Sequence, residues 1–435
     1  MSIFNVKDYG NAETGRAGVV LNAGMTLASP NDVTSASNPW TAGDVGKKIY
    51  IGGNVSPFTP VFPLAGATIT AFISAGHIQV DGPGTTATFV NGSCWWGQDD
   101  SQAFIDAKAD AAADVNGVGT VFVPTGNYII RQRIFNGAGQ NFVGQSKESV
   151  QLLVATDFDA PADGNGAVIE SNGDGAEITG FTLRGSKCID KDFSDGQAFV
   201  RLRGTSGYYH DFNLRGVGSS GGNTRGVDFK DCALLRAANI YCQIDPSLGY
   251  DSSNLTGVRF YNSYGVVENL LSSNFTLRNL LVTENAIGTG GLSGPAGILQ
   301  FVGGLIDENT TGGNFSVEIL SHGALSAVGW TAWTNGDSVN GYAVHVDGTS
   351  QLILANADLG PFQISGRGAL KLDAGGECRA NGTIFRAGGA QSVSVANAGK
   401  FVDSPTNRYR HVVAGAFADV NWRSALSSPT TVWRG

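Results

Sequence analysis

The sequence predicts an all-β solenoid, in which short strands wind as a coil and successive coils stack in parallel. A short sequence motif recurs between residues 167 and 398 at intervals of 25 to 40 residues, and most copies place a Gly or Asn beside an alternating apolar run. Turn and strand patterns recur without helical patterns between them, which favours a coil over a sandwich. The copies align on Phe181, Phe212, Ile240, Leu280, Leu305, Trp330, Ala357 and Ile384.

Apolar residues at equivalent positions of successive copies are expected to form ladders inside the coil. One predicted ladder contains Leu183, Leu214 and Val282. Another face is expected to carry Val168, Val200, Val227, Val258 and Val344.

The long interval between Ile240 and Leu280 has two explanations. An insertion at Ile244–Asn254 would lengthen one coil, or ENLLSSN from Glu268 would supply the missing copy in a different register. The spacing alone leaves both open.

Composition and charge restrict the function classes. Gly is 62 of 435 residues, about twice its typical share of ~7%, and charged residues are 15% against a usual ~25%, so turns are many and ionic surface is small. The net charge of -9 comes without a basic block, which disfavours nucleic acid as a partner. An acidic glycan would have to be bound by locally clustered Arg and Lys.

The sequence shows no targeting or membrane segment. The N-terminus lacks a basic region followed by an apolar core, so no signal peptide is expected, and no apolar run reaches the ~18 residues of a membrane span. The five cysteines form no CxxC pair or metal-ligand pattern, which predicts buried thiols in a protein folded in a reducing cytoplasm. They are Cys94, Cys188, Cys232, Cys242 and Cys378.

The first 150 residues predict an N-terminal cap. Residues 40–90 contain short strands of a small β insertion, and Gln98–Val115 has the periodicity of a helix that Asp99 or Asp100 would cap. An amphipathic helix is the expected cover for the open end of a solenoid. Its apolar stripe would contain Phe104, Ala107, Ala111 and Val115.

The order NVKDYG, DDSQAFIDAKADAA, GTVFVPTGNYII resembles the N-terminal cap of the pectate lyase-like, right-handed parallel β-helix superfamily. That superfamily includes polygalacturonases, alginate-modifying enzymes and phage tailspike depolymerases. The resemblance implies a right-handed parallel β-helix over residues 151–400 and a C-terminal cap or oligomerisation segment over residues 401–435. It specifies the fold more than the reaction.

The chain departs from this family in two ways. Roughly eighty residues separate the first Gly turn from the Asp-Asp helix, where the family usually has a few, and phage tail proteins of the superfamily often carry such an insertion. Only His322 resembles a polygalacturonase motif, with Ser321 before it. The other polygalacturonase motifs do not occur at usable positions, so that activity is excluded by motif.

Glycan hydrolysis usually needs two carboxyl groups across a groove, whereas elimination needs a base and a cation that neutralises a uronate. The candidate catalytic residues are Asp228, Glu284 and Asp307, which lie in or beside predicted strands. Glu284 and Asp307 occupy similar phases of successive copies and are expected to face one groove. The alternative is that each marks the solvated end of a strand.

Aromatic residues are the candidate substrate-binding groups, because sugar rings stack on them. Tyr208, Tyr209 and His210 form one cluster, in which His210 could also act as a base, and Trp330 is a second candidate. Their alternative role is packing in the core. No metal or other cofactor is expected, although the acidic loop Lys187–Gly196 offers a weak Ca²⁺ alternative through Asp190, Asp192 and Asp195.

We expect a phage tailspike-type protein that binds and depolymerises a bacterial surface polysaccharide, acting as a glycoside hydrolase or a polysaccharide lyase. A homotrimer, a virion tail location and a tail adaptor protein are part of this hypothesis. Two alternatives remain open. One is a free-standing bacterial lyase, hydrolase or epimerase, and the other is a non-catalytic structural or adhesion solenoid.

Overall fold

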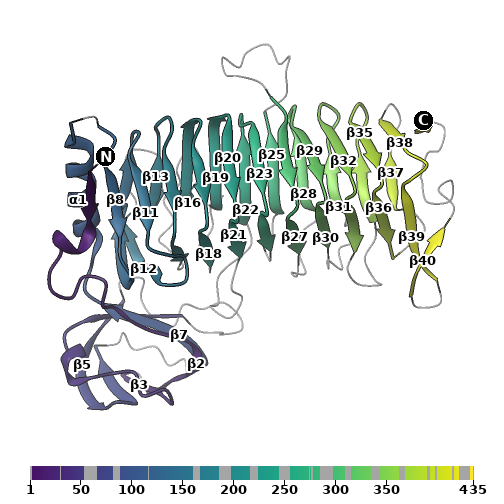
Figure 1. The fold of residues 1–435 in the computed structure, drawn as a ribbon. Coiled ribbons are helices and arrows are strands. Elements are labelled where there is room, and N and C mark those ends of the chain that lie inside the picture. Colours follow the sequence, from purple (N-terminus) through teal and green to yellow (C-terminus); the bar gives the residue numbers. More distant parts are fainter. Residues whose placement is uncertain are drawn as a thin grey trace.

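The structure is a computed structural model, and Figure 1 shows a long stack of strands with a small barrel beside its N-terminal end. It describes residues 2–29, 31–52, 66–81, 89–115, 117–159, 167–185, 197–215, 224–243, 255–273, 275, 278–284, 297–308, 315–334, 342–361, 368–388, 392–396, 399–413, 416–420 and 432–434.

Three long sheets form the sides of the stack. Sheet I has 13 strands: β1 (Ile3–Asn5), β8 (Thr120–Val123), β11 (Asn141–Gly144), β14 (Glu177–Thr179), β17 (Tyr208–His210), β20 (Leu235–Ala238), β23 (Gly265–Glu268), β26 (Leu299–Val302), β29 (Ala324–Val328), β32 (Gln351–Ala355), β35 (Glu377–Asn381), β38 (Lys400–Asp403) and β41 (Val432–Arg434). Sheet II has 12: β9 (Gly126–Gln132), β12 (Val150–Asp159), β15 (Thr182–Arg184), β18 (Asn213–Arg215), β21 (Tyr241–Gln243), β24 (Leu271–Ser273), β27 (Leu305–Glu308), β30 (Thr331–Thr334), β33 (Asp358–Pro361), β36 (Ile384–Ala387), β39 (Arg408–Val413) and β40 (Ala416–Val420). Sheet III has 10: β10 (Phe135–Gly137), β13 (Ile169–Ser171), β16 (Gln197–Thr205), β19 (Thr224–Ala233), β22 (Leu255–Tyr261), β25 (Arg278–Thr283), β28 (Phe315–Leu320), β31 (Tyr342–Val346), β34 (Gly368–Leu372) and β37 (Val393–Val395).

Each coil contributes one strand to each sheet in the order I, II, III, and pairs in parallel with the next coil. Strands β17, β18 and β19, for example, pair with β20, β21 and β22. Neighbouring strands in such a ladder lie ~4.8 Å apart, so equivalent side chains stack along the axis. The predicted parallel β-helix is confirmed.

The corner between sheets I and II is a one-residue turn with positive φ. Only Gly, Asn and Asp occupy it in the coils from residue 180 to 382, because a left-handed backbone is costly for other residues. The amides also bond from coil to coil: Asn239 Nδ2 donates to Asp211 Oδ1 at 3.1 Å, and Asn269 Nδ2 donates to Asn239 Oδ1 at 3.2 Å. The corner residues are Gly180, Asp211, Asn239, Asn269, Gly303, Gly329, Asn356 and Gly382.

The ladder of Leu183 and Leu214 exists, since the two pair across β15 and β18 and both are fully buried. Val282 does not belong to it. It lies in β25 of sheet III between Phe260 and Ile319, because alternating apolar runs look alike in all three sheets.

The second predicted face is largely correct. Val200, Val227 and Val258 pair in sequence across sheet III, and Val344 lies in the same row. Val168 does not belong to this row. The residue of its coil that does is the next one, Ile169, which pairs with Val200.

The second explanation for the long interval between Ile240 and Leu280, a copy in a different register, is the correct one. Tyr241 pairs with Leu271, so ENLLSSN supplies the missing copy, and Leu280 belongs to sheet III. The suggested insertion at residues 244–254 lies outside the described residues.

Helix α1 (Ser101–Ala113) covers the N-terminal end of the coil. Phe104 lies on the bore, with its ring 5.3 Å from Tyr128 and 6.2 Å from Phe142. The Asp99 carboxylate caps the helix by accepting a bond from the Ser101 N–H at 2.9 Å. Val115 is 95% exposed, so its place on the apolar stripe was wrong, because the helix ends two residues earlier.

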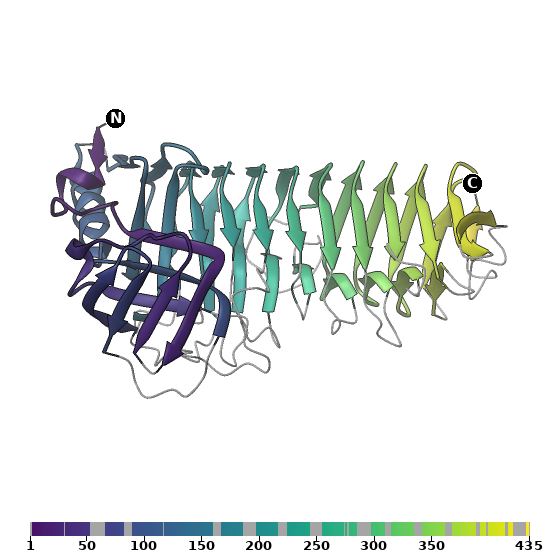
Figure 2. The same cartoon turned by 90° about the horizontal axis from the view of Figure 1, so that it is seen from below.

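The β insertion is a closed six-stranded barrel, which is larger than residues 40–90. Its strands are β2 (Gly18–Ser29), β3 (Asp32–Ser35), β4 (Lys48–Gly52), β5 (Ala67–Ser74), β6 (His77–Val80) and β7 (Phe89–Gly97). Tyr50 and Trp95 pack on Ile129 and Leu153 of sheet II, and this apolar contact holds the barrel against the first coils. Figure 2 shows the barrel beside that end of the stack.

The coil continues past residue 401, where a change of structure was expected. Phe401 pairs with Cys378 and Tyr409 pairs with Phe385, so β38 and β39 add another coil. The stack then ends differently, because β40 pairs antiparallel with β39.

Four of the predicted buried thiols, at 94, 232, 242 and 378, are free and buried, and burial raises the pKa of each. Cys188 lies outside the described residues.

A row of charged side chains runs along the outer face of sheet III. His345 stands between two carboxylates, with Nε2 2.9 Å from Asp373 Oδ2 and Nδ1 3.4 Å from Glu318 Oε1. Burial alone would lower the pKa of His345, but the hydrogen bonds and charges of the two carboxylates outweigh it and raise that pKa above its ordinary value. Glu318 also pairs with Arg278 at 2.6 Å.

We predict that Leu325→Asp abolishes folding and that Ser326→Asp does not. Leu325 is 1% exposed in the bore of β29, whereas the neighbouring Ser326 faces outward on the same strand. An unpaired buried carboxylate costs several kcal/mol, so the first variant should give no cooperative thermal transition. Circular dichroism melts of both variants measure this, and a stable Leu325→Asp protein would refute the in-out assignment.

His345 predicts a pH-dependent stability. Because its pKa is raised in the folded state, its contribution is complete below the unfolded pKa of ~6.5 and is lost as the pH rises through the folded value. We expect the melting temperature to fall over that interval in the wild type and less in His345→Gln. His322→Gln is the control, since His322 forms no ion pair among the described residues. Equal slopes in all three proteins would contradict the assignment.

Candidate functional site

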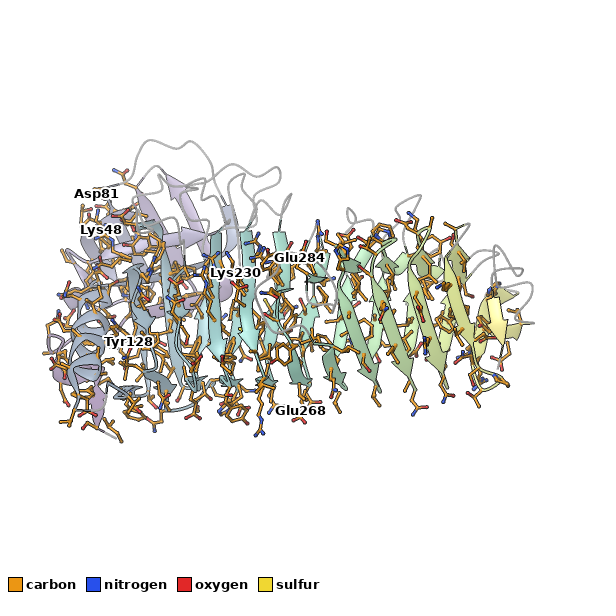
Figure 3. The ribbon with its side chains drawn as sticks, turned by 90° about the horizontal axis from the view of Figure 1, so that it is seen from above. Lys48, Asp81, Tyr128, Lys230, Glu268 and Glu284 are labelled. Atoms are coloured by element: carbon orange, nitrogen blue, oxygen red, sulfur yellow. The ribbon has the colours of Figure 1, made fainter. Side chains whose placement is uncertain are left out.

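The three predicted catalytic carboxylates do not share a face. Asp228 lies in β19 and Glu284 follows β25, both in sheet III, whereas Asp307 lies in β27 of sheet II. Figure 3 shows Glu284 at the edge of the stack opposite Glu268, which ends β23 of sheet I. The expectation of one groove between Glu284 and Asp307 was wrong, because the two belong to different sheets.

Asp228 is completely buried and surrounded by arginines. Its carboxylate lies 3.1 Å from Arg201 Nε, 2.6 Å from Arg259 Nε and 3.5 Å from Arg225 Nη1. Burial would raise the pKa of Asp228, but the Arg259 hydrogen bond and the charges of all three arginines hold it below its ordinary value. The residue stabilises the outer face of sheet III and is not accessible to a substrate.

The other two carboxylates differ in character. Glu284 is a turn residue with φ 60°, whose N–H donates to the Ser321 carbonyl at 3.0 Å. Burial raises the pKa of Asp307, and its Oδ1 is buried without a hydrogen-bond partner among the described residues. A carboxyl group whose pKa is raised by burial is suited to general acid chemistry.

Two of the four predicted substrate-binding residues lie in the core. Tyr209 is 0% exposed and Trp330 is 1% exposed, with the Trp330 ring 6.2 Å from Phe301. Their assignment to a sugar groove was wrong, since alternate residues of a strand face the bore. Tyr208 is 43% exposed and stands on the outer face of sheet I.

Tyr208 lines a shallow groove across three neighbouring strands of sheet I. This Tyr208 groove has a volume of about 490 Å³. Leu234 adds an apolar side chain that is 57% exposed, and Arg236 stands beside Tyr208 in the next coil. The lining residues are Ser206, Tyr208, Leu234, Leu235, Arg236, Gly265 and Val266.

His210 fixes the position of Tyr208. The two rings stack at 4.0 Å, and both nitrogens of His210 are engaged, with Nε2 2.9 Å from Glu177 Oε1 and Nδ1 2.8 Å from Asp211 Oδ2. Because neither nitrogen is available to take a proton from a substrate, His210 is a positioning residue in this arrangement. Sequence reasoning missed Glu177, which only the register of β14 with β17 brings to His210.

Arg236 supplies the charge of the groove. It is exposed and forms no ion pair within the described part of the chain. An aromatic ring, an apolar side chain and a guanidinium on adjacent coils can hold the face of a sugar ring and one acidic substituent. The guanidinium was missed because its neighbour Tyr208 lies 28 positions earlier in the sequence.

The described residues contain no cluster of three or more His, Cys, Asp or Glu that could hold a metal ion. The loop Lys187–Gly196, with Asp190, Asp192 and Asp195, lies outside those residues. In the same described part of the chain, α1 and the short helices fall below the length and apolarity needed to span a membrane.

Neither a family model nor a curated protein matches the sequence. Among solved structures, the A-module of mannuronan C-5 epimerase AlgE6 of Azotobacter vinelandii is similar at 13% identity, with a TM-score of 0.44 over 78% of this chain and 96% of that chain. The catalytic unit of a GH87 α-1,3-glucanase from Streptomyces thermodiastaticus is similar at 12% identity and a TM-score of 0.43, over 97% and 86%. Gene product 12 of bacteriophage phi29 is similar at 10% identity and a TM-score of 0.43, over 74% and 56%. These similar structures are thus an epimerase module, a glucanase and a phage protein, and at such TM-scores the likeness carries no argument about the substrate of this chain.

Proposed function

We propose that this protein binds a bacterial surface polysaccharide through the Tyr208 groove. The observation that carries the proposal is an exposed Tyr208 whose ring stacks on His210. Both nitrogens of His210 are hydrogen-bonded, and the exposed Arg236 stands beside Tyr208. A fixed aromatic ring loses little entropy when a sugar stacks on it.

The charge of the groove supports an acidic glycan. Glu177 and Asp211 are occupied by His210, while Arg236 has no partner in the described structure, so the groove offers one cation to a carboxylate or similar group. The overall charge of -9 opposes nucleic acid and also opposes acidic polymers at a distance. Binding therefore depends on this local cation and should weaken as salt is added.

We extend the proposal to a tailspike-type protein of a virion tail, attached through an adaptor and acting as a homotrimer. Val302 and Val328 pair across β26 and β29 of sheet I and are 47% and 45% exposed, and Ile353 on β32 is 38% exposed. Three parallel solenoids would cover such apolar faces in a closed cyclic assembly. The alternatives are a free-standing glycan-modifying enzyme and a non-catalytic adhesion solenoid.

Polysaccharide cleavage is a second candidate function, and the partly buried Asp307, whose Oδ1 has no hydrogen-bond partner among the described residues, favours it. A glycoside hydrolase needs a general acid, and burial raises the pKa of this carboxyl as that role requires. Asp307 lies on sheet II and the Tyr208 groove on sheet I, so binding and cleavage are separable in this proposal.

We predict that Tyr208→Ala and Arg236→Ala each weaken binding of capsule or lipopolysaccharide from the host by roughly tenfold, because each removes a stacking or charged contact. Arg379→Ala is a matched control, since Arg379 stands in the same outward row of sheet I beyond the groove and pairs with Glu377. Calorimetric titration measures the affinities. Unchanged affinity in Tyr208→Ala would reject the groove as the binding site.

Incubation of the protein with the polysaccharide, followed by measurement of the polysaccharide chain length, tests cleavage. Asp307→Asn should keep the affinity and abolish chain shortening. Binding without shortening by the wild type would favour the adhesion solenoid. Unsaturated products that absorb in the ultraviolet would instead show elimination, and the role of Asp307 as a hydrolytic acid would be rejected.

The homotrimer is tested by light scattering in solution. The wild type should have three times the chain mass, and Val302→Asp with Val328→Asp should have the mass of one chain, because two charges would be buried at the interface. Ser326→Asp, two residues before Val328 on the same face of β29, shows whether a single charge is tolerated. A wild-type particle with the mass of one chain would refute the trimer.

A further inference from the structure

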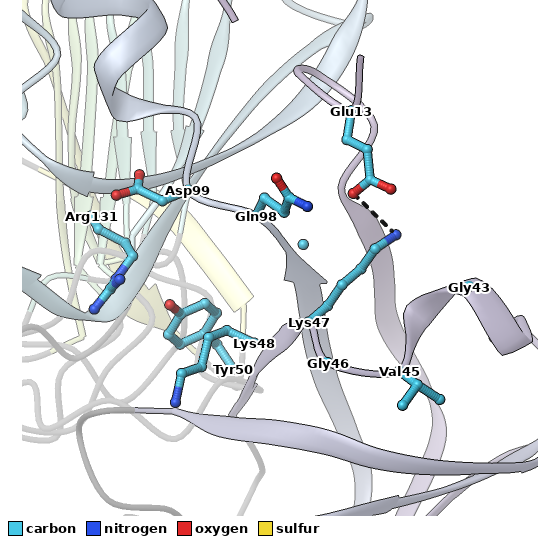
Figure 4. A pocket seen from close by; sticks show the side chains of 11 residues that line it. Glu13, Gly43, Val45, Gly46, Lys47, Lys48, Tyr50, Gln98, Asp99 and Arg131 are labelled. Atoms are coloured by element: carbon cyan, nitrogen blue, oxygen red, sulfur yellow. Dashed lines mark ion pairs between the residues drawn. The ribbon is translucent and has the colours of Figure 1, made fainter. Parts of the chain in front are cut away.

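A second cavity lies where the barrel meets the first coils. It has a volume of about 410 Å³, and we call it the junction cavity. Its polar walls come from the turn before β2, from β4 of the barrel, from the segment between β7 and α1, and from β9 of sheet II (Figure 4). The lining residues that matter here are Glu13, Lys48, Tyr50, Gln98, Asp99 and Arg131.

Lys48 offers an unused ammonium to this cavity. It begins β4, where Ile49 faces the barrel core, so Lys48 and Tyr50 face the opposite way. The neighbouring Lys47 is occupied by Asp44 at 3.0 Å and Glu13 at 3.5 Å. Lys48 forms neither an ion pair nor a hydrogen bond with any described residue.

Two further donors face the same space from other elements. Arg131 uses Nε and Nη2 to bind Asp157, at 3.2 and 2.5 Å, which leaves the two N–H groups of Nη1. Gln98 accepts a bond from Asn11 Nδ2 on its Oε1 at 2.7 Å, which leaves the N–H groups of its amide. Figure 4 shows the Lys48 and Arg131 nitrogens on the same side of the cavity, beyond the Tyr50 ring.

The acceptors restrict the ligand to a hydroxyl-rich molecule with a single negative charge. Asp99 uses Oδ1 to cap α1, so its Oδ2 can accept bonds from hydroxyls. Glu13, Asp99 and Asp157 place three carboxylates at or beside the cavity, and these repel a dianion such as a phosphate ester. Tyr50 borders the cavity, but its ring is 1% exposed and packs in the apolar contact between the barrel and sheet II, so it offers no stacking surface.

We propose that the junction cavity binds a uronate sugar unit, with its carboxylate on Lys48 and Arg131 and its hydroxyls on Gln98 and Asp99. The cavity is formed by the barrel and sheet II, whereas the Tyr208 groove lies on sheet I. The proposal is therefore independent of the function proposed for that groove, and the two can fail separately.

Titration of the full chain with D-glucuronate, followed by saturation-transfer NMR, tests the site. We expect saturable binding, weakened roughly tenfold in Lys48→Gln and unchanged in Lys108→Gln, which removes the same charge from α1 outside the cavity. Tyr208→Ala removes the stacking contact of the groove on sheet I, so saturable glucuronate binding that remains in this variant and is weakened by adding Lys48→Gln is assigned to the junction cavity. Gln98→Glu is a second variant, which places a negative charge in the cavity and should also weaken binding.

Three outcomes would overturn the proposal. They are no saturable binding of glucuronate by the wild type, equal binding by folded Lys48→Gln and Gln98→Glu proteins, and equal or tighter binding of glucose or glucose 6-phosphate. Loss of binding in Tyr208→Ala would likewise reject the junction cavity, because it would place the uronate in the groove on sheet I. Thermal melts of each variant establish that it is folded before its affinity is compared.

Discussion

Each strand of the β-helix must pair with its equivalent one coil further on, and the coils from residue 180 to 382 turn the corner between sheets I and II with the same backbone geometry. That corner has positive φ, from Gly180 to Gly382, and a residue with a β-carbon other than Asn or Asp would add roughly 1–2 kcal/mol of strain per coil. The recurring sequence motif follows from this constraint. Hydrogen bonds donated by the side-chain amides of Asn239 and Asn269, to Asp211 and Asn239 respectively, then link these corners to one another.

The same pairing creates the outer rows on which function depends. Residues about 30 positions apart become neighbours in the next coil, so Glu177 reaches His210 and Tyr208 stands beside Arg236. Inward residues are fixed by packing, as the stacked rings of Phe229 and Phe260 show. Outward residues do not have to pack in the bore, so the side chains of an outward row can differ while the fold stays the same.

The fold could be predicted because its signals are local: a turn residue, an alternating run and a capping helix. The register was less certain, because the strand at Leu280 carries the same alternating pattern in sheet III as the true copy at Leu271 carries in sheet II. The same ambiguity explains why only some of the predicted site residues face outward. Tyr208 was identified, but Tyr209 and Trp330 face the bore. Glu177 and Lys48 could not be found, since only coil register and barrel docking bring them to their sites.

Most of the described arginines that flank sheet III and the first coils pair with a carboxylate of the same or a neighbouring coil. Arg201 and Arg259 share Asp228, Arg278 binds Glu318, and Arg131 binds Asp157. In a chain with only 15% charged residues, such pairing uses much of the positive charge for stability. An exposed cation without a partner is then informative, because nothing in the fold requires it. Arg236 is such a cation, Lys48 is a partly buried cation without a partner among the described residues, and each lines a hollow, which is why they mark the two proposed binding sites.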